Sequence, residues 1–299
     1  MNTPAFKRFT LRDFNPVSGR TKVRVIGSPN EAMRRIHRLF IEYVRGLGVP
    51  MPNSTACLPG QSAVKNVLHH RKRNRRAFHR YFVLLDICSA YQAVEIDRLM
   101  EALVEIDPEM SRTEEETKKF MLDNFFDESG GLVTGGPASP DLFNLYCEIH
   151  IDSKLRGLCR MYGITYTRYL DDLVFSSEVP IGKKKRRALR NIVEAAGFRV
   201  SDKKAETIDL RKGPDTVNGV GITLEGRLFL PRHMLDHVRG LLHVALTKGA
   251  IKPSVIHGKM GLLSSVLRFN TERTESEKQI LVMYREFRNK QRQFQADQP

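Results

Sequence analysis

The 299-residue sequence lacks several features that mark whole classes of protein. It has no apolar run near the ~18 residues that a membrane span needs, and no signal-peptide core at its N-terminus. Its four cysteines have no CxxC spacing and no histidine pairs of zinc-site type nearby, so we expect free thiols in a reducing cytosol. Repeats and long low-complexity linkers are also missing. These absences predict a cytoplasmic globular protein with no membrane partner.

Acidic residues are in deficit. The chain has 34 Asp and Glu against 49 Lys and Arg, a formal charge of +15. Such an excess favours a polyanionic partner, most commonly a phosphate backbone, although charge alone does not exclude a protein that is merely basic. With 41% hydrophobic residues, the chain can bury a real core in one composite unit or two subdomains.

The order of predicted elements is mixed α+β with an all-helical end. A helix is expected after Asn30, and a buried strand is expected over 81–85, ending at Asp86. Ser139 is expected to cap a helix with Pro140 in its first turn. Further expected elements are a helix through 94–104, a basic helix over 183–196, short strands with Gly turns over 198–231, helices over 233–247 and 254–268, and a charged C-terminal helix.

The most informative stretch is Tyr169-Leu170-Asp171-Asp172, a predicted tight turn between two β-prone segments. Adjacent carboxylates are costly to place there unless a positive charge lies against them. A divalent metal suits them, because hard oxygen ligands bind magnesium well. For the tetrapeptide alone, a solvated hairpin turn is the stronger interpretation, since Asp commonly forms turns.

Asp86 supplies a third carboxylate at the end of a predicted strand. Phosphodiester synthesis by two metals needs carboxylates that hold both ions about 3.5–4 Å apart. Asp86 and the pair Asp171 and Asp172 converge if their two elements are neighbours in one sheet, a common α+β arrangement. The structural alternative for Asp86 is an N-cap for a helix that begins at Ser89.

Three ordered segments resemble successive palm motifs of reverse transcriptases. They are Asp86-Ile87-Cys88-Ser89-Ala90-Tyr91, then Gly135-Gly136-Pro137-Ala138-Ser139-Pro140 with Asn144, then Tyr169-Leu170-Asp171-Asp172. Further segments resemble later motifs, a basic fingers strand and a thumb helix: Gly197-Phe198-Arg199-Val200 with Lys204, Val217-Asn218-Gly219, Lys22-Val23-Arg24-Val25-Ile26, and the helix at 257–264. Any one motif is weak, but the ordered set is strong and covers most of residues 20 to 270.

Within that family, the chain is most similar to bacterial retron and antiphage-defence reverse transcriptases, which are related to the group II intron type. Asn66-Val67-Leu68-His69 resembles the retron Asn-Ala-x-x-His element, and Val217-Asn218-Gly219 resembles the retron Val-Thr-Gly. Two departures concern template handling and fidelity: Thr134 stands where the family has Gln, and Ala205 stands where it has Thr.

The resemblance implies a two-metal polymerase site. Asp86, Asp171 and Asp172 are the implied catalytic metal ligands, together with the backbone carbonyl of Ile87. The implied cofactor is a pair of Mg²⁺ ions, with Mn²⁺ as a substitute, which position the primer hydroxyl and neutralise the departing pyrophosphate. Lys204 is implied to protonate or stabilise that pyrophosphate, although Lys203 beside it is an alternative.

The resemblance also implies a deoxynucleotide site. Tyr91 is the implied steric gate against a ribose 2′-hydroxyl, and core packing is its alternative role. Arg24, with Lys22, is implied to grip the triphosphate, because a guanidinium offers a bidentate fork to phosphate oxygens. A generic basic surface strand is the alternative. Gly135 and Gly136 are implied to let template or sugar approach the backbone, or they only make the loop flexible.

The implied RNA-binding residues are Asn66, His69, Arg71, Arg73 and Asn218. Asn66 and His69 suit a capped helix as well, and the basic run at 71–76 is most often a solvated face. The implied partners are an RNA template with nascent DNA, deoxynucleoside triphosphates, a noncoding RNA and an effector protein.

The expected fold is therefore a right-hand polymerase of the α+β class. It has fingers at 1–80 with part of 105–135, an antiparallel-sheet palm at 81–231 and a helical thumb at 232–299. The expected function is RNA-directed DNA synthesis on a structured noncoding RNA in antiphage defence. Two alternatives stay open: a template-independent or protein-primed DNA polymerase of a defence system, and a non-catalytic RNA-binding scaffold.

Overall fold

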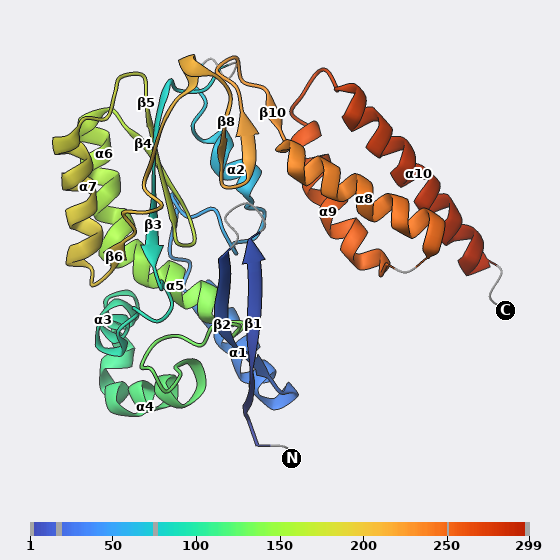
Figure 1. Cartoon of the computed structure of the whole chain (residues 1–299). Helices are drawn as coiled ribbons and strands as arrows, with labels where there is room; N and C mark the ends of the chain where they lie inside the picture. Colours follow the sequence, from blue (N-terminus) through green and yellow to red (C-terminus); the bar gives the residue numbers. More distant parts are fainter. Residues whose placement is uncertain (1–2, 16–19, 74–76, 250, 297–299) are drawn as a thin grey trace. The chain divides into compact units, whose positions relative to one another are not determined.

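The computed structural model describes residues 3–15, 20–73, 77–249 and 251–296, without the side chains of 13–15, 20, 22 and 294–296. The chain divides into two compact units (Figure 1). Unit 1 comprises residues 1–62 and 82–207, and unit 2 comprises residues 63–81 and 208–299. None of the described helices is long and apolar enough to cross a membrane.

Unit 1 contains most of the central sheet, a separate hairpin and the helices that pack on them. Its helical elements are α1 (Glu31–Gly46), α3 (Ile96–Ile106), η1 (Pro108–Thr113), α4 (Glu114–Phe125), α5 (Ser139–Cys147), η2 (Glu148–Asp152), α6 (Ser153–Tyr162) and α7 (Lys183–Ala195). Its strands are β1 (Phe6–Asn15), β2 (Arg20–Pro29), β4 (Thr165–Tyr169), β5 (Asp172–Ser177) and β6 (Arg199–Val200), with most of β3 (Tyr81–Cys88).

The central sheet brings together strands that are far apart in the sequence. Its order is β4-β5-β3-β6, and β7 (Glu206–Asp209) also pairs with β3. β4 pairs antiparallel with β5, and β3 pairs antiparallel with β6. The strand that carries Asp86 therefore lies beside the hairpin that carries Asp171 and Asp172. The α+β class and the antiparallel sheet are confirmed.

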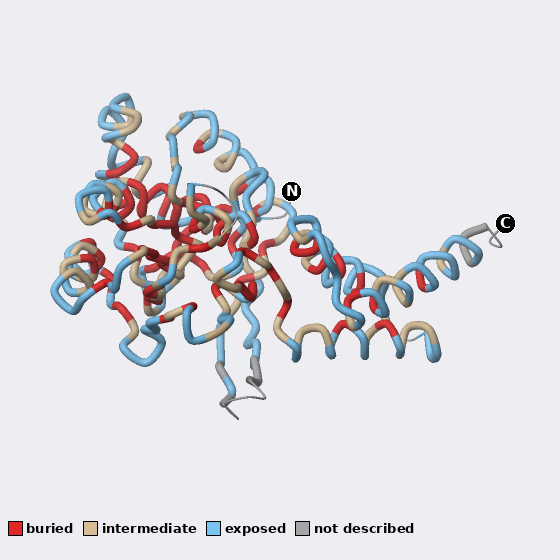
Figure 2. The backbone as a smooth tube through the Cα atoms, turned by 90° about the horizontal axis from the view of Figure 1, so that it is seen from above, coloured by how far each residue is buried: buried red, intermediate tan, exposed pale blue. Residues whose placement is uncertain are grey.

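The core of unit 1 lies between this sheet and its helices. α5 is buried along almost its whole length, with Leu142, Phe143 and Tyr146 fully buried. A helix that is buried on all sides lies in the middle of a core, where it gives the neighbouring loops a fixed base, and its buried polar side chains Asp141 and Asn144 are hydrogen-bonded. Buried segments gather in the interior, whereas the C-terminal end of the chain carries mainly exposed and intermediate residues (Figure 2).

Unit 2 combines a small sheet with a helical end. It contains α2 (Ala63–Leu68), η3 (Leu210–Lys212), and the strands β8 (Asp215–Val217), β9 (Val220–Ile222) and β10 (Leu228–Phe229) in the order β10-β9-β8. Its long helices are α8 (Arg232–Lys248), α9 (Pro253–Leu267) and α10 (Glu275–Ala296). The short strands and terminal helices predicted from the sequence are confirmed.

Local signals predicted some element ends and missed others. Asn30 caps α1, since its side chain accepts from the Met33 amide at 2.9 Å. The prediction that Ser139 caps α5 is wrong, because Ser139 is the first helical residue and its hydroxyl donates to the Val133 carbonyl. The strand at 81–85 continues through Asp86 to Cys88.

The β1–β2 hairpin is attached to the loop before α5 by a close backbone approach. The Gly27 amide donates to the Thr134 carbonyl at 2.8 Å. Gly135 has a φ of +97°, and a Cβ on it would lie 2.7 Å from the Gly27 carbonyl oxygen. Glycine is therefore needed at 135 for two reasons, a left-handed backbone and a neighbouring strand.

We expect Gly135→Ala to destabilise the protein by about 2 kcal/mol, because alanine is strained at that φ and meets backbone atoms. Gly157→Ala is the matched control, since Gly157 lies within α6 and a Cβ there meets nothing within 4 Å. The control should stabilise the protein by up to about 1 kcal/mol. Urea unfolding of both variants measures the difference, and equal midpoints would contradict the proposed role of Gly135.

Candidate active site

A cleft of about 1020 Å³ opens in unit 1. Its walls come from β2, the end of β3 with the turn after it, the loop around 127–134, the β4–β5 turn and the segment 199–204. Six of the residues predicted from the sequence line it: Arg24, Asp86, Ile87, Tyr91, Asp171 and Lys204. The fold therefore brings most of the predicted catalytic and nucleotide-binding residues of unit 1 to one place.

Asp86 lies within β3 and is only 7% exposed. Its carbonyl accepts from the Ser201 amide at 2.8 Å, next to the paired strand β6. Because β3 extends to Cys88 and α3 begins only at Ile96, Asp86 is not the N-cap of a helix. Because the Asp86 side chain does not cap a helix, its carboxylate is available at the cleft, where Asp86 is a lining residue.

The predicted hairpin is confirmed, and its turn has unusual backbone geometry. Tyr169 pairs with Asp172, so Leu170 and Asp171 form a two-residue turn. Leu170 has a φ of +55°, a conformation that such turns usually give to glycine. The Asp171 carbonyl accepts from the Ile87 amide at 2.9 Å. This hydrogen bond links the turn directly to the residue after Asp86.

The three carboxylates are close enough to affect one another. Burial and the negative charges of Asp171 and Asp86 raise the pKa of Asp172 to about 6, against the opposing effect of Lys204. Like charges in a partly desolvated site favour the protonated form. The folded protein therefore holds an electrostatic strain at this edge of the sheet that a cation would relieve.

One cation of the chain already lies there. The Lys204 ammonium forms a hydrogen-bonded ion pair with Oδ1 of Asp86. Burial lowers the pKa of Lys204, but the hydrogen bond and charge of Asp86 outweigh it, so the net pKa is raised. Lys204 therefore keeps its proton at neutral pH. The prediction that this lysine belongs to the site agrees with its place in the cleft.

The carboxylates of the cleft fit magnesium better than a metal whose ligands all come from protein side chains. Among the residues that the structure describes, no three His, Cys, Asp or Glu side chains form a ready-made metal-binding group. Mg²⁺ typically takes one or two carboxylates and completes its shell with waters and substrate phosphates. Two carboxylates that line an open cleft, with a third whose pKa they raise, match that requirement.

The predicted nucleotide-binding residues have different environments. Tyr91 lines the cleft and packs edge-on against Phe143, with ring centroids 5.5 Å apart. Arg24 on β2 also lines the cleft, whereas the Lys22 side chain is outside the described residues. Gly135 and Gly136 are not among the lining residues of the cleft. Gly136 packs instead against Ser139 and His37 beneath the loop.

The five predicted RNA-binding residues all belong to unit 2. Asn66 is fully buried and accepts from the Asn218 side chain at 3.2 Å, so these two bind each other. Arg71 donates to the Gly226 carbonyl at 2.7 Å and lies over the Phe78 ring. His69 and Arg73 are exposed. Their role in RNA binding stays a prediction.

Sequence reasoning missed several residues of both units. Gln92, next to Tyr91, lines the cleft and donates to the Thr134 hydroxyl at 2.6 Å. Unit 2 has a hollow of about 280 Å³ along α10, lined by Arg273, Leu281, Tyr284, Arg285, Arg288, Asn289 and Arg292. The spacing of the last three arginines places them on one helix face, a signal that was available in the sequence.

Comparison with known proteins identifies the family. Residues 14–224 match the family described as "Reverse transcriptase (RNA-dependent DNA polymerase)". This match covers well over half of the chain and includes every carboxylate of the candidate site. The chain belongs to the reverse transcriptase family, whose members generally use divalent metals.

Several curated relatives of the chain are retron enzymes. The chain is 28% identical over 266 residues to the retron Mx65 reverse transcriptase of Myxococcus xanthus, a match that covers 85% of this chain and 60% of that protein. It is 24% identical to the retron Ec83 reverse transcriptase of Escherichia coli, covering 73% of this chain and 70% of that protein. The chain thus spans about 60% of the length of the Mx65 enzyme.

Solved structures support the fold at much lower identity. Telomerase from Candida albicans, solved with a fragment of telomeric RNA, superposes with a TM-score of 0.57 at 13% identity, covering 96% of this chain and 56% of that one. Telomerase from Candida tropicalis superposes with a TM-score of 0.52 at 12% identity, and the match covers 93% of this chain and 56% of that one. At these identities the likeness shows the fold alone.

The raised pKa of Asp172 gives a pH-dependent prediction. Since the folded pKa of about 6 lies above the ordinary Asp value, this carboxyl reduces stability progressively as pH rises from about 4 to about 6. We expect metal-free Asp172→Asn to melt higher than wild type at pH 8, with a smaller difference at pH 5. Millimolar Mg²⁺ should reduce the difference in Tm between the variant and wild type at pH 8. A difference in Tm that does not change with pH would contradict the repulsion.

Proposed function

We propose that this protein is an RNA-directed DNA polymerase that works by a two-metal mechanism in the cleft of unit 1. The observation that carries the proposal is the hydrogen bond between the Ile87 amide and the Asp171 carbonyl. It fixes two acidic segments, far apart in the sequence, at one edge of a cleft. Membership in the reverse transcriptase family supports the same chemistry.

Asp86, Asp171 and Asp172, with the Ile87 carbonyl, would hold the ions. When bound, magnesium supplies activation of the primer 3′-hydroxyl and neutralises charge on the leaving pyrophosphate. The protein's part is to keep these oxygens together despite their repulsion. Lys204 is paired with Asp86 and lines the same cleft, so if Asp86 held a metal ion, the ammonium would be available to bind a phosphate oxygen of the leaving pyrophosphate.

The cleft also suits a nucleoside triphosphate. Arg24 on β2 and Lys204 after β6 both line the cleft, so two cations are available to bind phosphate. A guanidinium binds phosphate oxygens in a bidentate manner, so Arg24 would orient the triphosphate while the carboxylates hold the metals. Lys22 is proposed to assist from the same strand.

The template is proposed to be a structured noncoding RNA, as the similarity to retron enzymes suggests. His69, Arg71 and Arg73 would contact this RNA, and Asn66 with Asn218 would hold the hairpin β8–β9 against α2. The arginines of the α10 hollow would bind its phosphate backbone. An effector protein and a role in antiphage defence belong to the same proposal.

Asp171→Asn tests the catalytic assignment. It should lower deoxynucleotide incorporation at least about 10³-fold, because one of the proposed metal-binding carboxylates is lost. Gel-based primer extension on an RNA template measures the rate, and filter binding checks that RNA affinity changes less than about threefold. Incorporation at the wild-type rate would contradict the metal site. Homopolymer made without template would favour a template-independent polymerase, and an inactive wild type that still binds RNA would favour a scaffold.

Tyr91→Ala tests the nucleotide selectivity. The Tyr91 ring lies in the cleft against Phe143, where it would exclude a 2′-hydroxyl. We expect the variant to raise ribonucleotide use relative to deoxynucleotide use by at least about 10-fold, since a bulky ring no longer fills the space under the sugar. Phe143→Leu is the matched control for lost packing, and it should leave the selectivity ratio within about twofold. An unchanged ratio in Tyr91→Ala would remove Tyr91 as the gate.

A further inference from the structure

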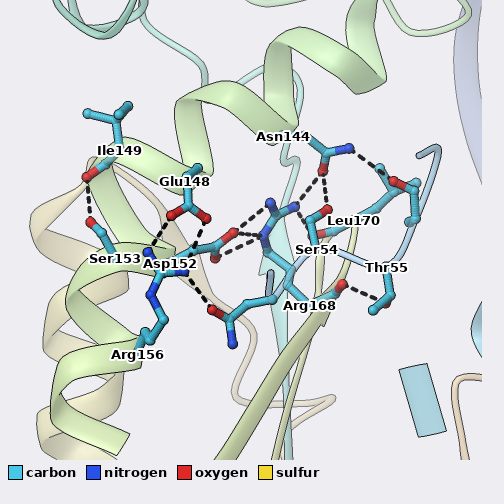
Figure 3. A network of polar contacts seen from close by, with 12 residues as sticks. Ser54, Thr55, Asn144, Glu148, Ile149, Asp152, Ser153, Arg156, Arg168 and Leu170 are labelled. Carbon is cyan, nitrogen blue, oxygen red and sulfur yellow. Dashed lines mark hydrogen bonds and ion pairs between the residues drawn. The ribbon is translucent and has the colours of Figure 1, made fainter. Parts of the chain in front are cut away.

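A fully buried ion pair lies beneath the hairpin that carries Asp171. The side chains of Arg168 on β4 and Asp152 at the end of η2 are both 0% exposed (Figure 3). Nε of Arg168 lies 3.1 Å from both Asp152 oxygens, and Nη2 lies 2.8 Å from Oδ2. Replacing a buried ion pair by apolar residues is often neutral or stabilising, so stability alone does not explain this pair.

The remaining nitrogen of the Arg168 guanidinium points to the turn. Nη1 donates to Oδ1 of Asn144 at 3.0 Å and to the Leu170 carbonyl at 3.2 Å. Asn144 is itself held, because it accepts from the Ser54 hydroxyl and donates to the Ala56 carbonyl. All three guanidinium nitrogens are thus hydrogen-bonded within a rigid polar network (Figure 3).

This contact controls the backbone of the catalytic turn. The Leu170 carbonyl belongs to the peptide that joins Leu170 to Asp171. The next carbonyl, that of Asp171, accepts from the Ile87 amide. Both peptides that flank Asp171 are therefore fixed, one by Arg168 and the other by β3. Leu170 holds a φ of +55°, a conformation that is strained for a residue other than glycine and persists only where its surroundings impose it.

We propose that Arg168, anchored by Asp152 and Asn144, is a positioning residue that sets the Leu170–Asp171 peptide and thereby keeps Asp171 at the metal-binding edge with Asp86. The inference rests on the proposed metal-dependent synthesis. A lysine cannot replace the arginine, because a single ammonium lacks the planar fork that reaches Asp152 and the turn together. Asp152 also accepts from the Tyr166 hydroxyl on β4 at 2.7 Å, but it and Asn144 reach the Leu170 carbonyl only through Arg168.

The same polar cluster supplies a matched control. Arg156 on α6 donates to Glu148 at 2.5 Å and to the Asn53 side chain at 2.8 Å (Figure 3). Its partner Glu148 is also buried, at 5% exposure. Arg156→Lys therefore makes the same substitution in the same cluster, and it changes contacts to Glu148 and Asn53 instead of the contact to Leu170.

The test compares full-length Arg168→Lys, Asp152→Asn and Arg156→Lys with wild type. In metal-free protein, hydrogen exchange of the hairpin 165–177 should be at least about fivefold faster in the first two variants, since their turn opens more readily. Mn²⁺ affinity, followed by electron paramagnetic resonance, should fall about 10-fold, and kcat should fall about 10–100-fold. KM for deoxynucleotide should stay within about twofold. Arg156→Lys should show none of these changes, even if its Tm falls.

Asp152→Asn keeps the shape of the side chain, so it tests the proposal even where Arg168→Lys does not fold. Unchanged hairpin exchange and Mn²⁺ affinity in Asp152→Asn, or equal changes in Arg156→Lys, would overturn the positioning role. If wild-type protein incorporates no deoxynucleotide, the proposed function is contradicted. The hydrogen-exchange measurement on the hairpin would still test the role of Arg168.

Discussion

The site depends on one backbone hydrogen bond, from the Ile87 amide to the Asp171 carbonyl. It joins the central strand β3 to the turn of the β4–β5 hairpin, so carboxylates from two distant segments face one cleft. A sheet can impose this proximity because its hydrogen bonds are numerous and its core is close-packed. Helices α5 and α6, with the buried pair Arg168 and Asp152, support that part of the sheet.

The favourable packing of unit 1 opposes an unfavourable charge arrangement. Asp86 is nearly buried, and the pKa of Asp172 is raised to about 6 because acidic neighbours lie close. Lys204 offsets part of the repulsion through its ion pair with Asp86. A site of this kind is strained without its ligand, as is common where folding and function make different demands.

The sequence predicted the elements with strong local signals. Asn30 marked the start of a helix, and the polar turn between β-prone runs marked the hairpin, because capping and turn chemistry are local. The ordered motifs also led to the lining residues Asp86, Asp171 and Lys204. The prediction that Ser139 is an N-cap was wrong, because its hydroxyl donates to the Val133 carbonyl, which lies close only in the folded loop.

Other residues were missed because their roles depend on tertiary contacts. No motif singled out Arg168, whose complete burial depends on its ion pair with Asp152 sixteen positions earlier in the chain. Gly135 was expected to admit a substrate, yet its neighbour in the structure is the Gly27 carbonyl. Gln92 carried no motif signal, although it contacts Thr134 across the cleft wall. Contacts of this kind join residues from separate segments, so residue spacing in the sequence does not predict them.

The β1–β2 hairpin has a consequence for the behaviour of the protein in solution. Among the described residues it is a two-stranded sheet that pairs with no third strand, although Gly27 of β2 bonds to the Thr134 carbonyl. Phe9, Leu11, Val23 and Val25 are 45–60% exposed. Such ribbons tend to pair with one another. Lys7, Arg8 and Arg12 place positive charge along β1, and like charges oppose the pairing of two copies. The same cations that attract a polyanion thus also protect the free protein from self-association, and this protection weakens as salt rises.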